Sequence, residues 1–199
     1  MNKTLAWLTD PHLDFLDERQ LMTFIESVAK EATNGMVMTG DIAEARSLLP
    51  ILARFDEAMA APLWFVLGNH DYYGGSIHAQ REQVAAWSGG SRHVRWLPQS
   101  GVVSLSETTA LVGHGGWGDG GYGDFMASGI MLNDYRHIED LVCSSKGELF
   151  RRLRELGIEA ADIIEGFLDS AFKEHEHVIL ATHVPPFVES CWHEGQATL

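Results

Sequence analysis

The sequence has few cysteines and no long apolar run. Only Cys143 and Cys191 occur among 199 residues, and no C-x-x-C spacing is present, which excludes a disulfide framework and a cysteine-based zinc site. This cysteine usage fits a reducing compartment. No window is long and uncharged enough for a membrane span or a secretory signal. We therefore expect a cytoplasmic protein without a membrane span.

Basic residues are also scarce. The 14 Lys and Arg against 28 Asp and Glu give a formal net charge of −14. This balance argues against a general nucleic-acid surface, because phosphate backbones are held mainly by clustered Lys and Arg. The densest basic run, at 151–154, lies at helical spacing from acidic residues and is typical of a solvated helix face. Local positive potential would have to come from bound metal.

Length and composition predict one globular unit. A chain of 199 residues fits one ordinary domain with a single substantial core. Hydrophobic residues make up 45% and charged residues 21%, which is a globular balance. No repeat, low-complexity tract or linker indicates a second domain. We expect a single domain over residues 1–199.

Strand-like and helix-like segments alternate in the first half. Apolar runs at 4–8, 36–39 and 63–67 read as buried strands. They are followed by helical patterns at 18–30, within 43–60 and near 77–87. This alternation predicts parallel strands with crossover helices.

The pattern changes after residue 90. Short runs at 94–97, 102–105 and 109–112 are typical of hairpin strands in a mixed sheet. A glycine-rich stretch at 113–123 predicts a long functional loop. Helical periodicity resumes over 146–173, with a break expected at Gly157, and a last strand is expected at 178–181.

Polar clusters follow four of the strand-like runs. They are Asp10-Pro11-His12, Gly40-Asp41, Gly68-Asn69-His70-Asp71 and Thr182-His183. Ligands of open α/β sheets bind beyond the carboxyl ends of the strands, so these clusters are expected to converge. Asp10 precedes a proline and is expected to be extended, so that Asp10 and His12 project to the same side and grip one ion. The mixed oxygen and nitrogen set suits Mn, Fe or Zn better than Ca, and Mg is possible.

In this order the four clusters resemble the calcineurin-like metallophosphoesterase family, over residues 10 to 183. The resemblance implies an α/β fold with two mixed β-sheets sandwiched together and flanked by helices. It implies two divalent metal ions: Asp10 and His12 match ligands of the first, Asp41 the bridge, and Asn69 and His183 ligands of the second. His70 matches the phosphate-facing histidine, and Asp71 the carboxylate that orients it.

The chain departs from the family at its end. The family closes its site with Gly-His-x-His, each histidine serving one metal, and this motif does not occur after His183. We expect the fold to be incomplete at its C-terminus, with the final strand and two histidine positions missing, because an unpaired sheet edge would be a liability. The alternative is that the missing ligands come from elsewhere. We expect weak or no turnover from the chain as it stands.

Several residues have a structural alternative. Asp41 alone would read as a helix N-cap, and Asp71 as a local turn residue. His114, Trp117, Tyr122 and Arg136 are candidates to line a substrate pocket, and each is equally a plausible loop residue. Core positions are expected for Trp7, Trp64 and Phe65, which lie on strands.

The sequence thus predicts a metal-dependent phosphohydrolase acting on a small phosphomonoester or phosphodiester, with a hydroxide activated by a two-metal centre. One alternative is a phosphoesterase-like fold that serves as a non-catalytic binding or scaffold module. A second is a nuclease of the same family, which the charge disfavours. Loops choose the substrate, so the sequence leaves it open, as it does the oligomeric state.

Overall fold

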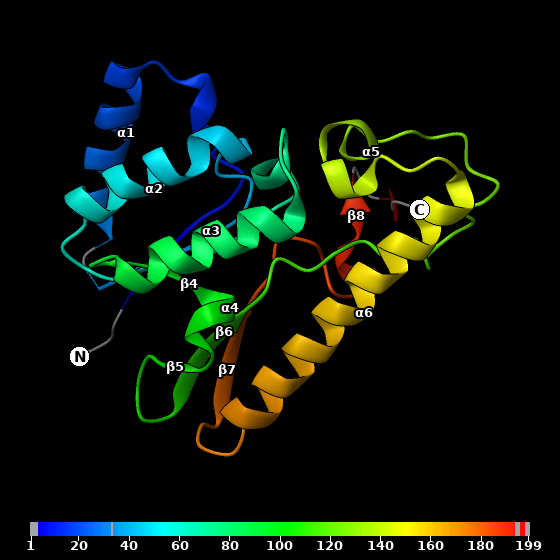
Figure 1. The fold of residues 1–199 in the computed structure, drawn as a ribbon. Coiled ribbons are helices and arrows are strands. Elements are labelled where there is room, and N and C mark those ends of the chain that lie inside the picture. The colour runs from blue at the N-terminus through cyan, green and yellow to red at the C-terminus, as the bar shows by residue number, and fades with distance from the viewer. Residues whose placement is uncertain (1–3, 33, 194–195, 198–199) are drawn as a thin grey trace.

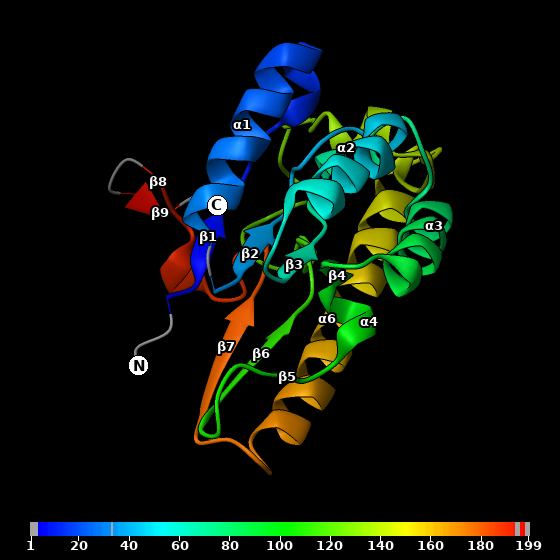
Figure 2. The ribbon, with the colours of Figure 1, turned by 90° about the vertical axis from the view of Figure 1, so that its left-hand side faces the viewer.

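The computed structural model describes residues 4–32, 34–193 and 196–197. Two sheets face each other and helices cover their outer sides (Figure 1 and Figure 2). The first sheet has the order β1-β2-β3-β4, and the second β5-β6-β7. The first-sheet strands are β1 Ala6–Leu8, β2 Met36–Thr39, β3 Leu63–Val66 and β4 Val94–Trp96. Those of the second are β5 Val103–Ser104, β6 Thr109–Gly113 and β7 His177–Ala181.

The predicted α/β class, with two sheets flanked by helices, is confirmed. The long helices are α1 Glu18–Glu31, α2 Ala45–Ala58, α3 Ile77–Gly90 and α6 Lys146–Ala171. Short helices are α4 Leu97–Ser100, α5 Asp134–His137, η1 Leu13–Phe15, η2 His70–Tyr72, η3 Glu139–Leu141 and η4 Val188–Ser190. A two-residue pair, β8 Trp192–His193 and β9 Gln196–Ala197, follows.

One strand pairs differently from the sequence prediction. β4 was expected in a hairpin, but it runs parallel to β3, so the described first sheet is parallel throughout. A connection through α3 separates β3 from β4, and a helical crossover returns the chain in the same direction. Only the second sheet is mixed: β5 and β6 are antiparallel, and β6 and β7 are parallel.

Alternation along the strands divides the core into layers. Met36 and Met38 of β2 pack with the α1 and α2 side chains, whereas Val37 packs between the two sheets. In β6, Leu111 points into that same layer, and Ala110 and Val112 pack with α6 residues. Successive side chains of a strand point to opposite faces, so each of these short strands contributes side chains to two apolar layers.

Trp7 was predicted to lie in the core, and this prediction was wrong: its side chain is 73% exposed. Its register partner is Val37, so Trp7 lies on the side of β1 that faces the second sheet. β1 is an edge strand of the described sheet, which leaves the Trp7 ring exposed. The indole N–H of Trp7 donates to the Thr39 hydroxyl at 3.0 Å. Phe65 and Trp64 behave as expected, being buried and partly buried.

The break predicted at Gly157 does not occur, because α6 continues through it. A Cβ at this position would lie 2.5 Å from the Cβ of Asp119. Only glycine at position 157 allows the glycine-rich loop around Asp119 to pack this closely against α6. This contact outweighs the conformational cost of a glycine inside a helix. None of the helices in the described part of the chain is long and apolar enough to span a membrane.

Candidate metal centre

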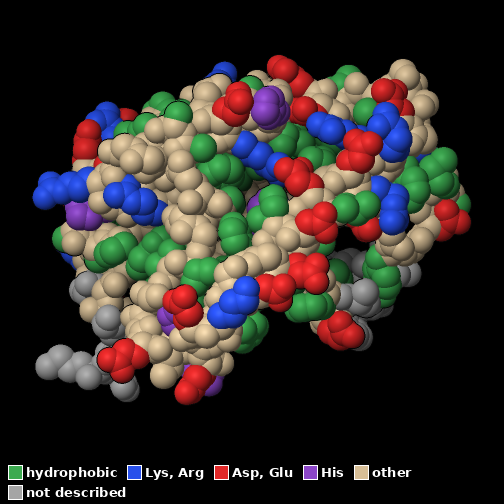
Figure 3. Space-filling model, turned by 60° about the horizontal axis from the view of Figure 1, so that its bottom comes forward, with side chains coloured by type: hydrophobic (Ala, Val, Ile, Leu, Met, Phe, Trp, Pro, Cys, Tyr) green, Lys and Arg blue, Asp and Glu red, His purple; other side chains and the backbone are tan. Residues whose placement is uncertain are grey.

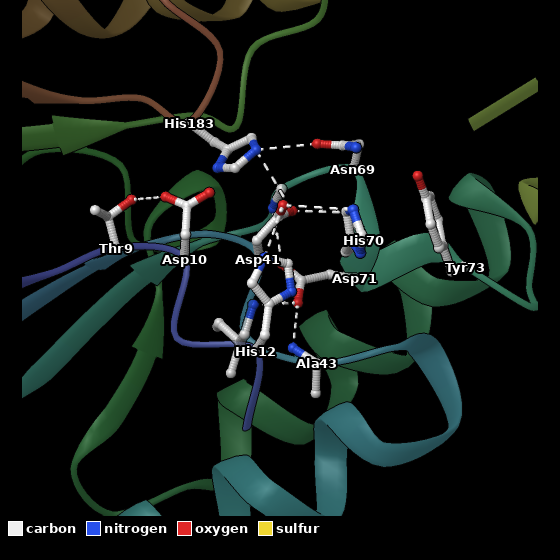
Figure 4. A network of polar contacts seen from close by, with 12 residues as sticks. Thr9, Asp10, His12, Asp41, Ala43, Asn69, His70, Asp71, Tyr73 and His183 are labelled. Carbon is white, nitrogen blue, oxygen red and sulfur yellow. Dashed lines mark hydrogen bonds and ion pairs between the residues drawn. The ribbon is translucent and has the colours of Figure 1, made fainter. Parts of the chain in front are cut away.

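The loops after β1 and β2 lie side by side and build the first half of the centre. Backbone hydrogen bonds continue past the strand ends: Asp10 N–H donates to Gly40 O at 3.2 Å, and His12 N–H to Asp41 O at 3.0 Å. The loop after β3 supplies Asn69 and the following residues. Figure 4 shows Asp41 in the middle of the cluster, with His183 and Asn69 on one side and His12 on the other.

Three of these loop residues have a backbone conformation that is rare for residues other than glycine. Asp10, His12 and Asp41 have φ values of 50°, 42° and 51°. The prediction that Asp10 is extended was therefore wrong. Aspartate and histidine tolerate positive φ better than most residues, and such strained positions concentrate at functional sites.

Asp41 is the central acceptor. It is 5% exposed, and its Oδ1 accepts a hydrogen bond from the His70 backbone N–H at 2.9 Å. Three imidazole nitrogens approach its carboxylate. His183 Nε2 lies 3.4 Å from Oδ1, and His12 Nε2 and His70 Nε2 lie 3.8 and 4.0 Å from Oδ2. One carboxylate thus faces ligand atoms on both of its oxygens, as a bridging ligand would.

The potential ligands form two groups that share Asp41. One contains His12, Asp41 and His70, and the other Asp10, Asp41 and His183, with ligand atoms within 4.8 Å of one another in each. This division differs from the expected one, in which Asp10 and His12 bind the same ion. Left-handed backbone at both residues removes the extended geometry on which that expectation depended.

Three acceptor atoms come together around His183: its own Nε2, Asn69 Oδ1 and Asp41 Oδ1. His183 Nδ1 lies 2.9 Å from the Thr39 carbonyl, which can only accept, so Nδ1 carries the ring proton. In the neutral ring Nε2 is then a bare acceptor, facing Asn69 Oδ1 at 3.0 Å and Asp41 Oδ1 at 3.4 Å. A proton on Nε2 would satisfy these oxygens, and a cation would satisfy the nearby Asp10 carboxylate as well.

The spacing of these three atoms fits a metal ion. Ligands about 2.1 Å from one ion lie about 3.0 Å apart at octahedral angles and about 3.4 Å apart at tetrahedral angles. The separations of 3.0 and 3.4 Å from His183 Nε2 to Asn69 Oδ1 and Asp41 Oδ1 lie within this range. The group around His12 is wider, at 3.8 and 4.0 Å. The residues present are thus compatible with a divalent cation at the second group.

Asp71 differs from what the resemblance implies. Its Oδ1 accepts the backbone N–H groups of Ile42 and Ala43 at 2.8 and 3.0 Å, and its Oδ2 that of Gly68 at 2.7 Å. Both oxygens therefore hold the Asp41 loop to the Asn69 loop, instead of orienting the His70 ring. Complete burial raises the pKa of Asp71 to about 7, and the Asp41 carboxylate acts in the same direction, against the three N–H donors.

Gly68 allows these two loops to touch. A Cβ at this position would lie 2.2 Å from Asp41 Oδ1 and 2.6 Å from Asp41 N. No side chain other than hydrogen fits between the backbone and the central carboxylate. The glycine of the Gly-Asn-His-Asp motif is therefore required by close approach.

Tyr73 orients the His70 ring, a role that was not predicted. The two rings are stacked with centroids 4.2 Å apart and an interplanar angle of 22°. His70 begins the one-turn helix η2, in which side chains three residues apart eclipse each other. An aromatic residue at the third position after His70 was the signal in the sequence that could have indicated this contact.

Asp134 fixes the Asn69 amide and was also missed. Its Oδ1 accepts from Asn69 Nδ2 at 2.9 Å and from the Tyr73 hydroxyl at 2.5 Å. The amide oxygen of Asn69 is thereby turned toward His183. Burial and the Asp134 carboxylate raise the pKa of Tyr73, so its hydroxyl remains a donor. Asp134 is more than 60 residues from Asn69 and follows an irregular loop, so no sequence signal pointed to it.

The four predicted pocket residues are dispersed. Trp117 lines a cavity beside Asn69 and His183, and Tyr122 lines a neighbouring one. Arg136 is exposed. His114 is 4% exposed, and its Nδ1 accepts the Gly116 N–H at 3.0 Å, which organises the loop. Burial and Arg81 lower the pKa of His114 to about 4. The contact of each residue with a substrate stays a prediction.

Comparison with known proteins identifies the family. The family model of calcineurin-like phosphoesterases matches residues 3–199. The chain belongs to the calcineurin-like phosphoesterase family. A search of curated proteins finds no match. The fold of this phosphoesterase family is also found in two similar solved structures.

Both structures resemble the chain in fold at low sequence identity. Phosphopantetheinyl hydrolase from Mycobacterium tuberculosis is 12% identical, with a TM-score of 0.65 over 94% of this chain and 70% of its own. A dimetal phosphatase from Danio rerio is 15% identical, with a TM-score of 0.51 over 92% of this chain and 70% of its own. Family membership supports a metal-dependent phosphoesterase in general terms.

Proposed function

We propose that this chain is a phosphohydrolase that binds two divalent cations and cleaves a small phosphomonoester or phosphodiester. The observation that carries the proposal is the set of three acceptor atoms, His183 Nε2, Asn69 Oδ1 and Asp41 Oδ1, spaced as ligands of one ion. Asp10, His12 and His70 extend this set around the shared Asp41. Family membership over residues 3–199 supports the same reaction.

When bound, two divalent cations supply a hydroxide near neutral pH and neutralise the phosphoryl charge. The side chains have complementary roles. Asp10, His12, Asp41, Asn69 and His183 would hold the ions, with Asp41 between them. His70 would contact the phosphoryl group or donate a proton to the leaving alkoxide, since its ring is held at the centre by Tyr73. Asp71 would preserve the loop geometry.

Hydrolysis of chromogenic phosphate esters tests the proposal. The purified chain is assayed with 4-nitrophenyl phosphate and bis(4-nitrophenyl) phosphate, with manganese and with EDTA. We expect weak, manganese-dependent turnover that EDTA removes, and a loss of more than about 100-fold in Asp41→Asn, because the shared ligand is weakened. Asp162→Asn, an exposed site on α6, is the matched control. Activity that resists both EDTA and Asp41→Asn contradicts the proposal.

Calorimetric titration of manganese, combined with the ester assays, distinguishes a hydrolase from a non-catalytic binding or scaffold module. A binding or scaffold module would bind the ion with the same dependence on Asp41 but turn over neither ester. A nuclease would prefer oligonucleotides, for which the surface offers little support. On the face shown in Figure 3, acidic and basic side chains are interspersed, without an extended basic patch among the described residues. Manganese as the ion, cytoplasmic residence and a single domain over 1–199 stay predictions from the sequence.

A further inference from the structure

A cavity of about 180 Å³ opens beside the candidate metal centre. Asn69 and His183 form part of its wall, so its contents lie next to two of the proposed ligands. Hydrolysis forms a bond from water oxygen to phosphorus and breaks the bond from phosphorus to the alcohol oxygen, and the alcohol leaves with a proton. A phosphoryl group held at the centre would place one of its substituents in this cavity.

Apart from Asn69, His183 and Asp134, the wall consists of mainly apolar side chains and glycine backbone. Leu67 and Leu153 are both 3% exposed and belong to the floor, because they are part of the buried core. The other apolar lining residues are Trp117, Leu132, Tyr135 and Val184. A neutral apolar group would replace water in this space favourably.

Among the described residues, the cavity offers an anionic group no cationic partner. The charged side chain in this part of the wall is Asp134, whose carboxylate already accepts from Asn69 and Tyr73. No Lys or Arg lines it within the part of the chain that the structure describes. Burying a second phosphate or a carboxylate there would leave a desolvated charge beside Asp134, which is strongly unfavourable.

Size limits the group as well. A dry cavity of roughly 150 Å³ accommodates benzene. A space of about 180 Å³ therefore fits one ring or a chain of about six carbons, and is too small for a nucleoside. A second cavity of about 590 Å³ lies beyond Trp117 and Val184, which line both spaces. A longer chain would have to pass these two residues.

We propose that this cavity receives the leaving alcohol of the substrate, and that this alcohol carries an uncharged apolar group of ring or six-carbon size. The proposal rests on the phosphohydrolase function proposed above. It names a substrate class, the phosphate esters of small apolar alcohols, and it excludes nucleoside polyphosphates.

A series of alkyl phosphates with the same type of leaving group tests the proposal. We expect kcat/KM with manganese to rise about two- to fourfold per methylene from ethyl to hexyl phosphate, and then to level off. The phosphate ester of 6-hydroxyhexanoate differs from hexyl phosphate only in that a carboxylate replaces the terminal methyl group. We expect it to be hydrolysed at least about tenfold less efficiently. Equal rates for the two, or a continued rise to dodecyl phosphate, would overturn the assignment.

A charge introduced into the wall should reverse this preference. Leu132 is 46% exposed, so Leu132→Lys leaves the core intact while placing an ammonium group at the cavity. We expect the kcat/KM for hexyl phosphate, divided by that for the phosphate ester of 6-hydroxyhexanoate, to fall at least about tenfold. The matched control is Ile130→Lys, which adds the same charge two residues away, at a 69% exposed site outside the cavity wall. The same ratio in wild type and Leu132→Lys would contradict the assignment.

A binding measurement without metal separates this proposal from the proposed function. Benzyl alcohol is titrated into the EDTA-treated chain and followed by methyl NMR. We expect saturable shifts of the Leu67 and Leu153 methyl signals that weaken in Leu132→Lys. Saturable benzyl alcohol binding without phosphoester turnover under any metal would refute the proposed phosphohydrolase function. The binding of an apolar alcohol in the cavity would remain supported. Turnover without benzyl alcohol binding would refute the cavity assignment alone.

Discussion

Replacing Asp134 by alanine tests whether the Asn69 amide is oriented by its neighbour. The carboxylate accepts two hydrogen bonds, from Asn69 Nδ2 at 2.9 Å and from the Tyr73 hydroxyl at 2.5 Å. Without it, the Asn69 amide can flip or rotate and turn its oxygen away from His183. The Tyr73 hydroxyl, on a side chain that is 8% exposed, loses its partner.

The size of the effect follows from these two contacts. A hydrogen bond to a charged acceptor contributes about 1.5–3 kcal/mol, and an unsatisfied buried donor costs about 1–3 kcal/mol. Asn69 is only half-buried, so water replaces part of its loss. We expect Asp134→Ala to lower the free energy of unfolding by about 2–4 kcal/mol. Residues that orient metal ligands typically change metal affinity by about 10–100-fold, and we expect a loss in this range.

Two measurements on the EDTA-treated chain report these losses. Manganese affinity is measured by isothermal titration calorimetry, and the free energy of unfolding by urea denaturation without metal. Asp134→Asn keeps one acceptor and should lose less in both. The control is Glu139→Ala, which removes an exposed carboxylate close by in the chain and should change neither quantity. Manganese affinity in Asp134→Ala within twofold of wild type would refute the role of Asp134 in orienting the amide.

Three further perturbations test the loops and the buried ionisable groups. Asp56 accepts the backbone N–H groups of Arg92, His93 and Val94; burial alone would raise its pKa, but these hydrogen bonds lower it. The stabilisation is therefore fully present above pH 4 and is lost as the pH falls through the lowered pKa of Asp56, so Asp56→Ala should cost about 2–3 kcal/mol in urea denaturation at pH 7 and progressively less below pH 4. Burial lowers the pKa of His114 to about 4, so the contribution of His114 to the free energy of unfolding should fall by up to about 3 kcal/mol between pH 6.5 and 4. The raised pKa of Asp71 acts in the opposite direction, so the contribution is read as the difference in slope between wild type and His114→Gln. An unchanged slope would show that His114 is not the group that titrates. Gly68→Ala brings a Cβ to within 2.2 Å of Asp41 Oδ1, and we expect manganese affinity measured by calorimetry to fall more than about tenfold, whereas Gly129→Ala, where a Cβ has open space, should retain it.

The strand ends of the candidate site could be predicted from sequence because an apolar run and the polar residues after it are local signals. The alternation of strands and helices then indicated parallel pairing. Each apolar run ended two residues before Asp10, Asp41, Asn69 or His183, and parallel pairing of β1, β2 and β3 brings the first three ends together. The elements of the first half follow the prediction closely, for example α1 at Glu18–Glu31 against an expected 18–30.

The predictions that failed concern residues whose structure depends on contacts between distant segments or on an unusual backbone conformation. Gly157 reads as a helix break from local propensity, but its place is decided by the approach of Asp119. A residue before proline is usually extended, but the loop hydrogen bonds hold Asp10 at positive φ. Asp134 lies in a segment without periodicity, so its contact with Asn69 exists only in the folded chain.

His183 also links the two sheets to each other. It follows β7 of the second sheet, yet its Nδ1 lies 2.9 Å from the carbonyl of Thr39 on β2 of the first. This contact fastens one sheet to the other at the site itself. A relative slide of the sheets by about 1 Å would carry the pair beyond hydrogen-bonding range and would withdraw Nε2 from Asp41 and Asn69 by a similar amount. A displacement of one sheet relative to the other would therefore disturb the ligand set around Asp41 as well.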